Sequence, residues 1–393
     1  MGNCTSDSHG SAQKQEPLEW FARMIPNCKE YARAAHTAGR PIVGIMCEYA
    51  PRELLMAAGA VPVCLCGGDP DTIPAAETQL PANLCPLIKS TYGYLVEKAN
   101  PFLEMADLVV AETTCDGKKK MFELMSQSRR TYLMVVPHRE NDPAATEQMA
   151  QEMHRLKLFL EERYKTVITT DKLRAAIATM NRERLLRRQL AALMKRDNPP
   201  LTGRQLLDLK SIISGIPADL EQYELALQLL GNQPDVPRRN GKVRVLLTGV
   251  PLVHGAERVM DIIEEHGGLV VCQENCTGLK PILDDVDENA PDPLRALAEK
   301  YYPLPCSIKT PNTKRLELIR TLAAEYRAEA VIELIWHACL TYAVESFHVK
   351  RLVEQELGLP YLQIETDYSP ADSARIAARV EALVETARTR AAR

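Results

Sequence analysis

The sequence predicts an α/β protein built from two Rossmann-like open parallel-sheet domains, with helical segments before and between them. Three observations predict this fold. Apolar β-branched runs alternate with segments of helical period, the alternation occurs twice, and a long stretch of helical composition separates the two blocks. With 393 residues, the chain is long enough for two or three domains that each bury a core.

The first block follows a segment of helical period that fills residues 1–40. Four apolar runs are typical of strands: 42–46, 61–65, 108–112 and 132–137. Helical periodicity separates them, at 51–60, 91–99 and 119–127. Strands that alternate with helices form parallel sheets covered on both faces. We therefore expect the first Rossmann-like domain over residues 41–142.

The alternation stops at residue 143. Stretches rich in Leu, Ala, Glu, Arg and Lys at 170–196 and 218–230 predict a helical connector over residues 143–240, which ends in a segment containing Pro and Gly. The strand pattern then returns at 243–247. We expect a second Rossmann-like domain with a C-terminal helix over residues 241–393.

The two blocks are copies of one unit, because the same features recur in the same order. In each block a strand and a helix are followed by Gly and a Val-rich strand that ends in cysteines, at Cys64 and Cys66 in the first block and at Cys272 and Cys276 in the second. Further along, two pairs of cysteines match: Cys85 with Cys306 before a helix, and Cys115 with Cys339 after the third strand.

These cysteines predict a shared site. In open α/β sheets, ligands gather outside the carboxyl ends of the strands. If the two halves face each other about a pseudo-twofold axis, their strand ends and thiols converge on one cleft. The recurring set comprises three cysteines per half: Cys47, Cys85 and Cys115, and Cys276, Cys306 and Cys339. The match between Cys47 and Cys276 is imperfect, since the first follows the first strand and the second follows the second strand.

A competing interpretation treats the cysteines as small apolar core residues. We favour it for Cys64 and Cys272, and we expect no chemistry of Cys4 and Cys28, which lie outside the repeat. A zinc site is a further alternative, but zinc knuckles use close pairs such as Cys-x2-Cys, and the spacings here fit poorly. Thiolates dispersed along a chain and gathered by its fold suit an iron–sulfur cluster better.

Three motifs resemble the 2-hydroxyacyl-CoA dehydratase and benzoyl-CoA reductase family, and within it the double-cubane cluster proteins most closely. They are Cys47-Glu-Tyr-Ala-Pro-Arg-Glu-Leu-Leu-Met-Ala-Ala-Gly-Ala-Val-Pro-Val, Leu80-Pro-Ala-Asn-Leu-Cys85-Pro and Ala111-Glu-Thr-Thr-Cys115-Asp-Gly-Lys-Lys-Lys-Met-Phe-Glu. The resemblance covers most of the chain from about residue 17. It implies two Rossmann-like domains with a helical part, a homodimer and oxygen sensitivity.

The resemblance also implies a double-cubane (8Fe-9S) cluster, in which two four-iron cubanes share a bridging sulfide and each is held by three cysteines. Cys47, Cys85 and Cys115 would hold one cubane, and Cys276, Cys306 and Cys339 the other. Cys66 and Cys272 are substitutes for Cys47 and Cys276.

Such a protein reduces small substrates with low-potential electrons from a separate ATP-dependent iron–sulfur reductase. The sequence agrees with ATP hydrolysis by the separate reductase, since it contains no Gly-x4-Gly-Lys-Ser/Thr phosphate loop.

Charged residues beside the cysteines are candidates for catalysis, as general acids or as hydrogen-bond donors to cluster sulfurs. The candidates are Glu48, Lys89, Lys309, Glu333 and His337. For each of them, a solvated surface position or a charge at a helix end is the competing interpretation. His337 is the strongest of the five, because it follows an apolar strand and stands two residues from Cys339. The run Lys118-Lys119-Lys120 is more typical of a solvated face.

Two other functions remain open. A single 4Fe-4S cluster would make the chain a subunit of a 2-hydroxyacyl-CoA dehydratase, a lyase, or of an acyl-CoA reductase. A noncatalytic protein that stores electrons or senses redox state is the second alternative.

Composition excludes several other classes. The 48 Lys and Arg residues against 52 Asp and Glu residues give a net charge of -4, so there is no basic surface for nucleic acid. No apolar run approaches the roughly 20 residues that span a membrane. In the absence of a secretory signal pattern, we expect the cysteines in a reducing compartment and the protein in the cytoplasm.

Overall fold

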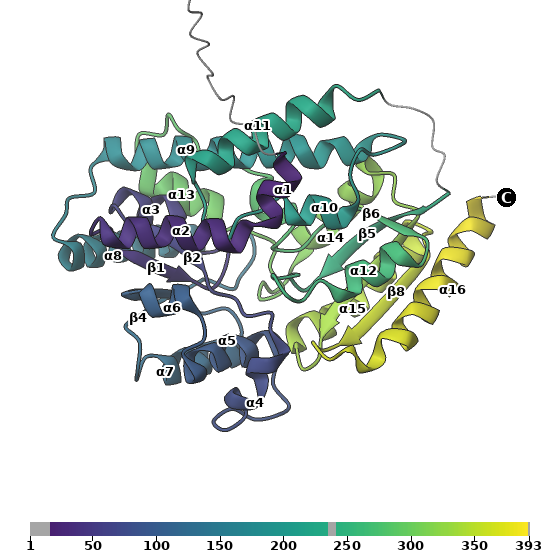
Figure 1. Ribbon diagram of the computed structural model, residues 1–393, viewed down its shortest axis with the longest axis horizontal. Helices are drawn as coiled ribbons and strands as arrows, with labels where there is room; N and C mark the ends of the chain where they lie inside the picture. Colours follow the sequence, from purple (N-terminus) through teal and green to yellow (C-terminus); the bar gives the residue numbers. More distant parts are fainter. Residues whose placement is uncertain (1–15, 235–240, 392–393) are drawn as a thin grey trace, which may run out of the picture.

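The computed structural model describes residues 16–234 and 241–391, and it contains two four-stranded sheets (Figure 1). All strand pairs within both sheets are parallel. The predicted α/β fold with two Rossmann-like units is therefore confirmed. The boundaries proposed for the domains stay a prediction.

The first sheet has the order β2-β1-β3-β4. Its strands are β1 (Ile42–Ile45), β2 (Val61–Cys64), β3 (Leu108–Glu112) and β4 (Thr131–Met134). The helices of this half are α3 (Arg52–Ala57), α4 (Ile73–Ala76), α5 (Pro86–Glu97), α6 (Pro101–Met105) and α7 (Asp116–Met125). Two helices precede them, α1 (Pro17–Ala22) and α2 (Met24–Thr37).

The second sheet has the corresponding order, β6-β5-β7-β8. Its strands are β5 (Val243–Gly249), β6 (Gly268–Gln273), β7 (Ala330–Trp336) and β8 (Tyr361–Thr366). The helices of this half are α12 (Arg258–Glu265), α13 (Pro293–Tyr301), α14 (Thr313–Glu325), α15 (Leu340–Arg351) and α16 (Ser373–Ala391). The shared strand order bears out the internal repeat. It also places the reversal of strand order between β1 and β3 in one half and between β5 and β7 in the other, where open α/β sheets bind ligands.

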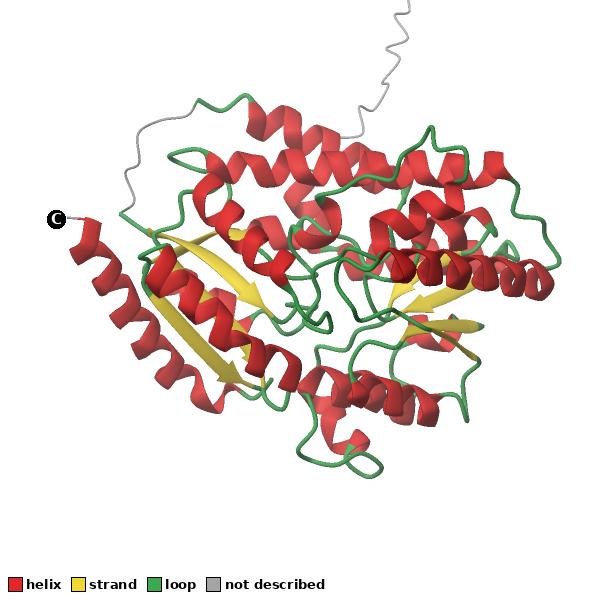
Figure 2. Cartoon of the chain, turned by 180° about the vertical axis from the view of Figure 1, so that it is seen from behind, coloured by secondary structure: helices red, strands yellow, loops and turns green. Residues whose placement is uncertain are grey.

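Sequence explains the central strands directly. β1, β3, β5 and β7 are buried along their whole length, as their mainly apolar sequences predict for parallel strands covered on both faces. The strands of both sheets run toward the loops in the middle of the molecule (Figure 2).

The connector lies along one side of both halves (Figure 1). Up to residue 234 it contains the α-helices α8 (Pro143–Tyr164), α9 (Thr170–Ala192), α10 (Gly203–Asp208) and α11 (Pro217–Gly231). Arg184 of α9 pairs with Glu53 of α3 at 2.9 Å, and the Tyr301 hydroxyl of α13 donates to the same carboxylate at 2.7 Å. The connector thus joins the two halves through a buried ion pair. None of the described helices combines the length and apolar character needed to cross a bilayer.

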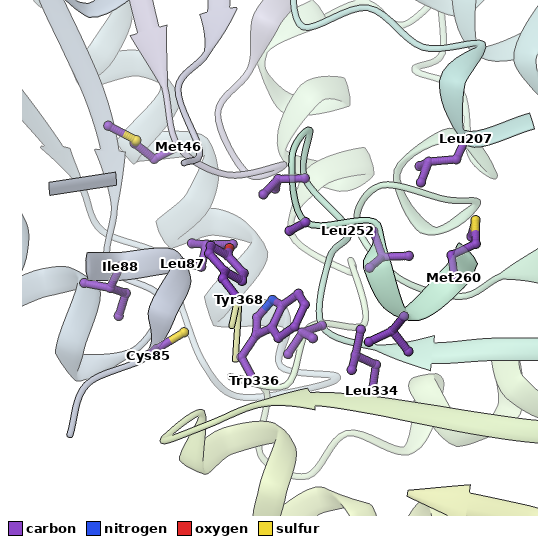
Figure 3. Close-up of a cluster of buried hydrophobic side chains, with 14 of the residues drawn as sticks. Met46, Cys85, Leu87, Ile88, Leu207, Leu252, Met260, Leu334, Trp336 and Tyr368 are labelled. Atoms are coloured by element: carbon purple, nitrogen blue, oxygen red, sulfur yellow. The ribbon is translucent and has the colours of Figure 1, made fainter. Parts of the chain in front are cut away.

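The halves also share a hydrophobic core (Figure 3). Met46 and Ile88 of the first half belong to one buried cluster with Trp336 and Tyr368 of the second. The rings of Trp336 and Tyr368 meet edge to face with their centroids 5.0 Å apart, and the Tyr368 hydroxyl donates to the Gly67 carbonyl at 3.1 Å. This continuous packing fixes the two sheets relative to each other.

Backbone segments of the two halves approach closely next to that contact. A Cβ atom added to Gly68 would lie 2.2 Å from the carbonyl oxygen of His254, which is too short for any real contact. We expect Gly68→Ala to lower the free energy of unfolding by about 1–3 kcal/mol, because the two backbones must move apart. Urea unfolding followed by circular dichroism measures the change.

Gly231→Ala is the matched control, since a Cβ atom at this position meets nothing within 4 Å. It should leave stability unchanged or raise it slightly, because alanine favours the helix that ends there. Equal unfolding midpoints for the Gly68→Ala variant and the wild type would contradict the account of this contact.

Candidate functional site

The recurring cysteines lie where strands and helices meet at the centre of the molecule. Cys47 follows β1 and Cys115 follows β3, the two strands at which the order of the first sheet reverses. Cys276 follows β6 and Cys339 follows β7. The topology therefore delivers thiols from both halves to the same region.

Three of these cysteines occupy helix N-caps: Cys85 before α5, Cys115 before α7 and Cys339 before α15. Backbone N–H groups of the following turn favour the thiolate form of each and so oppose a rise in its pKa. The positive N-terminal end of the helix dipole also favours the thiolate and lowers the pKa of a nearby thiol. The repeat thus places Cys115 and Cys339 in equivalent positions at helix N-termini.

The structure brings all six predicted thiols into one connected group. Cys85 and Cys339, from opposite halves, lie close enough for each thiol to affect the pKa of the other. Cys115 lies within electrostatic range of Cys339 and Cys306, and Cys306 within range of Cys276. Cys47, the sixth thiol, lies within electrostatic range of Cys276 and Cys306. Every described cysteine is free of disulfide bonds.

The remaining cysteines differ in their distance from the group. Cys64 is half-buried against the core and interacts with Cys66. Cys66 belongs to the margin of the group, since it interacts with Cys47 and its thiol donates to the Met46 carbonyl at 3.1 Å. Cys272 is buried away from the group, where burial raises its pKa and its charged neighbours are Arg and Glu residues rather than thiols. Cys28 hydrogen-bonds to Ser211 at 3.0 Å, and Cys4 lies outside the described residues.

Burial is the main influence on the protonation of two thiols of the group, Cys47 and Cys276. It raises the pKa of Cys276 to about 12 and the pKa of Cys47 well above its usual value. Lys118 opposes this effect, because its ammonium lies near Cys47, Cys66 and Cys115 and donates to the Met46 carbonyl at 2.8 Å. The interpretation of the lysine run as a solvated face is therefore wrong for Lys118, although Lys120 is exposed.

A buried charge network supports the second half of the group. Arg315 is fully buried and contacts Glu274 at 3.2 Å and Glu333 at 3.0 Å. Lys280 pairs with Glu274 at 2.7 Å and lies within electrostatic range of Cys276 and Cys306. Sequence reasoning missed this network, because its members are far apart in the chain and each alone looks like a surface charge.

Two of the five predicted catalytic residues lie beside the thiols. Glu48 interacts electrostatically with Cys276 and forms an ion pair with Arg52 at 2.8 Å. Burial would raise the pKa of Glu48, but Arg52 and Lys210 outweigh it and hold the pKa below its usual value. Lys309 is buried near Cys306, and burial lowers its pKa to about 8.

The other three predicted residues are engaged elsewhere. The Glu333 carboxylate contacts Arg315 and accepts a hydrogen bond from the Tyr361 hydroxyl at 2.6 Å. Lys89 pairs with Glu77 at 2.7 Å, and the largely exposed His337 pairs with Glu365 at 3.2 Å. None of these contacts involves a thiol, and a catalytic role for the three stays a prediction.

Glu112 is a further group at this site with an unusual environment. It ends β3 fully buried, and neither of its carboxylate oxygens has a hydrogen-bond partner among the described residues. Burial raises its pKa to about 7, although Lys118 opposes the shift.

The donor set fits an iron–sulfur cluster in its chemistry. In residues 16–234 and 241–391, no three His, Cys, Asp or Glu side chains are arranged as ligands of one metal ion. A polynuclear cluster has a different requirement, because its thiolates bind different irons and need not converge on a single ion. Free thiols contributed by both halves, with Cys85 buried and the other five half-buried, meet that requirement.

Comparison with known proteins gives the family. The profile of 2-hydroxyglutaryl-CoA dehydratase, D-component, matches residues 47–387. The chain belongs to this family. Its match begins at Cys47 and includes all six thiols of the group. The predicted kinship with 2-hydroxyacyl-CoA dehydratases and benzoyl-CoA reductases is thus confirmed.

Relatives in this dehydratase family differ in their sequence identity to this chain and in the share of each chain that aligns. The chain is 41% identical to the putative dehydratase subunit YjiM of Escherichia coli (strain K12), over 88% of this chain and 91% of that protein. It is 24% identical to the (R)-phenyllactyl-CoA dehydratase beta subunit of Clostridium sporogenes, over 93% and 97% of the two chains. A shorter match, to one of the subunits of benzoyl-CoA reductase from Thauera aromatica, is 26% identical and covers 40% and 41%.

The Arg315 network gives a stability test in this family member. We expect Arg315→Met to lower the free energy of unfolding by about 3–5 kcal/mol, because it leaves Glu333 buried without its countercharge and Glu274 with Lys280 as its only ion-pair partner among the described residues. Urea unfolding of the variant and the wild type measures the loss.

Arg320→Met is the control, since Arg320 pairs with Glu356 at the surface. Removal of an exposed pair should cost less than about 1 kcal/mol. Similar losses for both arginine variants would contradict a special role of the buried network.

Proposed function

We propose that the chain is an iron–sulfur oxidoreductase with a double-cubane (8Fe-9S) cluster between its two halves. The supporting observation is the single connected group formed by Cys47, Cys85, Cys115, Cys276, Cys306 and Cys339, with three thiols from each half. The location of Cys272 outside this group favours Cys276 as the ligand of the second half. When bound, such a cluster supplies low-potential electrons for reduction of a small substrate.

Residues of the chain would assist this chemistry in defined ways. Lys309 is a proton donor near Cys306, since a pKa of about 8 lets its ammonium release a proton close to neutral pH. Glu48, next to Cys47, would act as an ionised carboxylate that accepts hydrogen bonds and holds Arg52 beside the site, because its pKa is lowered. Lys118 would balance the negative charge of the thiolates on the first half, as Lys280 would on the second. The shared core around Trp336 excludes water from one side of the site.

The proposal also includes partners and location. A separate ATP-dependent iron–sulfur reductase would donate the electrons, as the family resemblance implies. The free state of every described cysteine suits a reducing compartment, and we place the protein in the cytoplasm. The physiological partner chain is a second copy, so that the protein acts as a homodimer.

A second candidate function is a subunit of a 2-hydroxyacyl-CoA dehydratase or acyl-CoA reductase with a single 4Fe-4S cluster. The names of the relatives favour it, because they include dehydratase subunits and a benzoyl-CoA reductase subunit. The thiol group favours the first candidate, since one cubane would leave half of the six thiols without a role.

Iron and acid-labile sulfide analysis of anaerobically purified protein separates these candidates. We expect about eight irons per chain for the double-cubane cluster, against about four for the dehydratase cluster. We also expect Cys115→Ser and Cys339→Ser each to lose at least about half of the iron, because a cubane loses one of its ligands.

Cys272→Ser is the matched control and should keep the full content of iron and sulfide. Circular dichroism verifies that each variant is folded. Zinc without sulfide in the wild type, or unchanged iron in the Cys115→Ser and Cys339→Ser variants, would contradict the proposal.

The homodimer has a candidate interface on α15. Leu340, Val344 and Phe347 are 73%, 75% and 68% exposed, and their spacing puts them on one face of the helix. We expect Phe347→Asp to convert a dimer into a monomer, because a charge would be buried between the copies. Sedimentation equilibrium measures the mass.

Leu158→Asp, at a 51% exposed position on α8, is the control and should leave the dimer intact. A monomeric wild type, or a dimeric Phe347→Asp variant, would contradict this interface.

A further inference from the structure

A cavity of about 100 Å³ lies beside the thiol group, between the connector and both halves. Glu48 and Arg52 of the first half, Arg187 of α9 and His254 of the second half all line it. Cys64 and Cys66 form another part of its wall, which places the cavity at the margin of the thiol group. No proposed role in the preceding subsections uses this space.

The lining of the cavity has an excess of positive charge. It includes five Arg and Lys side chains and three Glu side chains: Arg52, Arg184, Arg187, Lys210 and Lys300, and Glu48, Glu183 and Glu257. Two of the arginines are neutralised by close carboxylates, Arg52 by Glu48 at 2.8 Å and Arg184 by Glu53 at 2.9 Å. The other cations have weaker or no carboxylate contacts.

Lys210 has the fewest polar contacts of these cations. Its ammonium makes no hydrogen bond and no ion pair with any of the described residues, although Glu48 interacts with it over a longer distance. Arg187, which lines the same wall, has only a 3.7 Å contact with Glu183. The Glu183 carboxylate is itself held by the backbone N–H of Gly215 at 2.7 Å. Two adjacent cations thus face the cavity with incomplete countercharge.

A second, smaller cavity of about 40 Å³ adjoins the first one. The two share Arg187, Lys210, Leu207, Thr277 and Ile282 in their walls. The smaller cavity is otherwise mostly apolar, with several aliphatic side chains in its lining: Leu190, Leu206, Val271 and Leu279. Positive charge and apolar surface therefore meet at Arg187 and Lys210.

We propose that this pair of cavities binds a short-chain organic carboxylate. The carboxylate group contacts Lys210 and Arg187, and the alkyl end enters the apolar cavity. The volumes exclude larger ligands, because sites for drug-sized molecules measure about 300–1,000 Å³. A molecule of a few heavy atoms fits, whereas a complete CoA thioester does not. This carboxylate site is independent of the type of cluster at the thiols.

Calorimetric titration of the anaerobically purified protein with propionate tests the proposal. Propionamide, which has the same shape without the charge, is the matched probe. We expect propionate to bind and propionamide to bind at least about tenfold more weakly, since a charge-assisted hydrogen bond to a half-buried cation is lost. Lys210→Met should weaken propionate binding by about tenfold or more, and Lys210→Arg should retain most of it.

Lys350→Met, which removes an exposed lysine of α15, is the control and should bind propionate like the wild type. Urea unfolding verifies that the Lys210 variants are folded. Undetectable binding of propionate to the wild type would overturn the proposal. So would equal affinities for propionate and propionamide, or equal affinities of the wild type and the Lys210→Met variant for propionate.

Discussion

The packing of the two halves against each other is the constraint on which the candidate site depends. Each half alone presents three of the recurring thiols, two that follow strands and one in a loop that leads to a helix, and only the shared core around Trp336 and Tyr368 brings the two sets together. The contact of Tyr368 with Gly67 and the close approach of Gly68 to His254 lie in this junction. The connector adds the buried pair of Arg184 with Glu53. A loss of this packing would therefore divide the site rather than merely loosen it.

The two copies of the repeat share their topology and differ in their electrostatics. In the first half, Lys118 is the main positive charge beside the thiols, and the Glu112 carboxylate near it has no hydrogen bond to any described residue. In the second half, Lys280 and Arg315 belong to a network with several buried carboxylates. Buried charges are retained in proteins only when they are paired or have a function. The first half, where the Glu112 carboxylate has no hydrogen bond to a described residue, is thus the side of the site whose charges can change more readily when a group binds.

Much of the architecture follows from sequence because it depends on local periodicity and on the internal repeat. β3 forms over the same residues that the sequence predicts, since Leu108 to Val110 give an unbroken apolar run before Ala111. α5 begins at Pro86, ahead of the predicted helix at 91–99, because proline suits the first turn after the Cys85 N-cap. The grouping of the thiols follows from their places at strand ends.

The positions of the charged side chains at the site depend on tertiary contacts that no local sequence pattern encodes. Arg315 meets Glu274 and Glu333 only when β6, β7 and α14 are assembled. Lys118 and Lys120 are neighbours in one run, yet one points toward the thiols and the other toward solvent. His337 stands two residues from Cys339, but its side chain pairs with Glu365. Proximity in sequence is a poor guide to the orientation of charged side chains, and a better guide to the positions of the thiols.

The most direct measurement is anomalous diffraction at the iron absorption edge from crystals grown without exposure to air. The account predicts iron within bonding distance of thiols from both halves, with Cys115 and Cys339 among the ligands. Iron bound by the thiols of one half alone, or thiols of the group in contact with each other and with no iron, would contradict it.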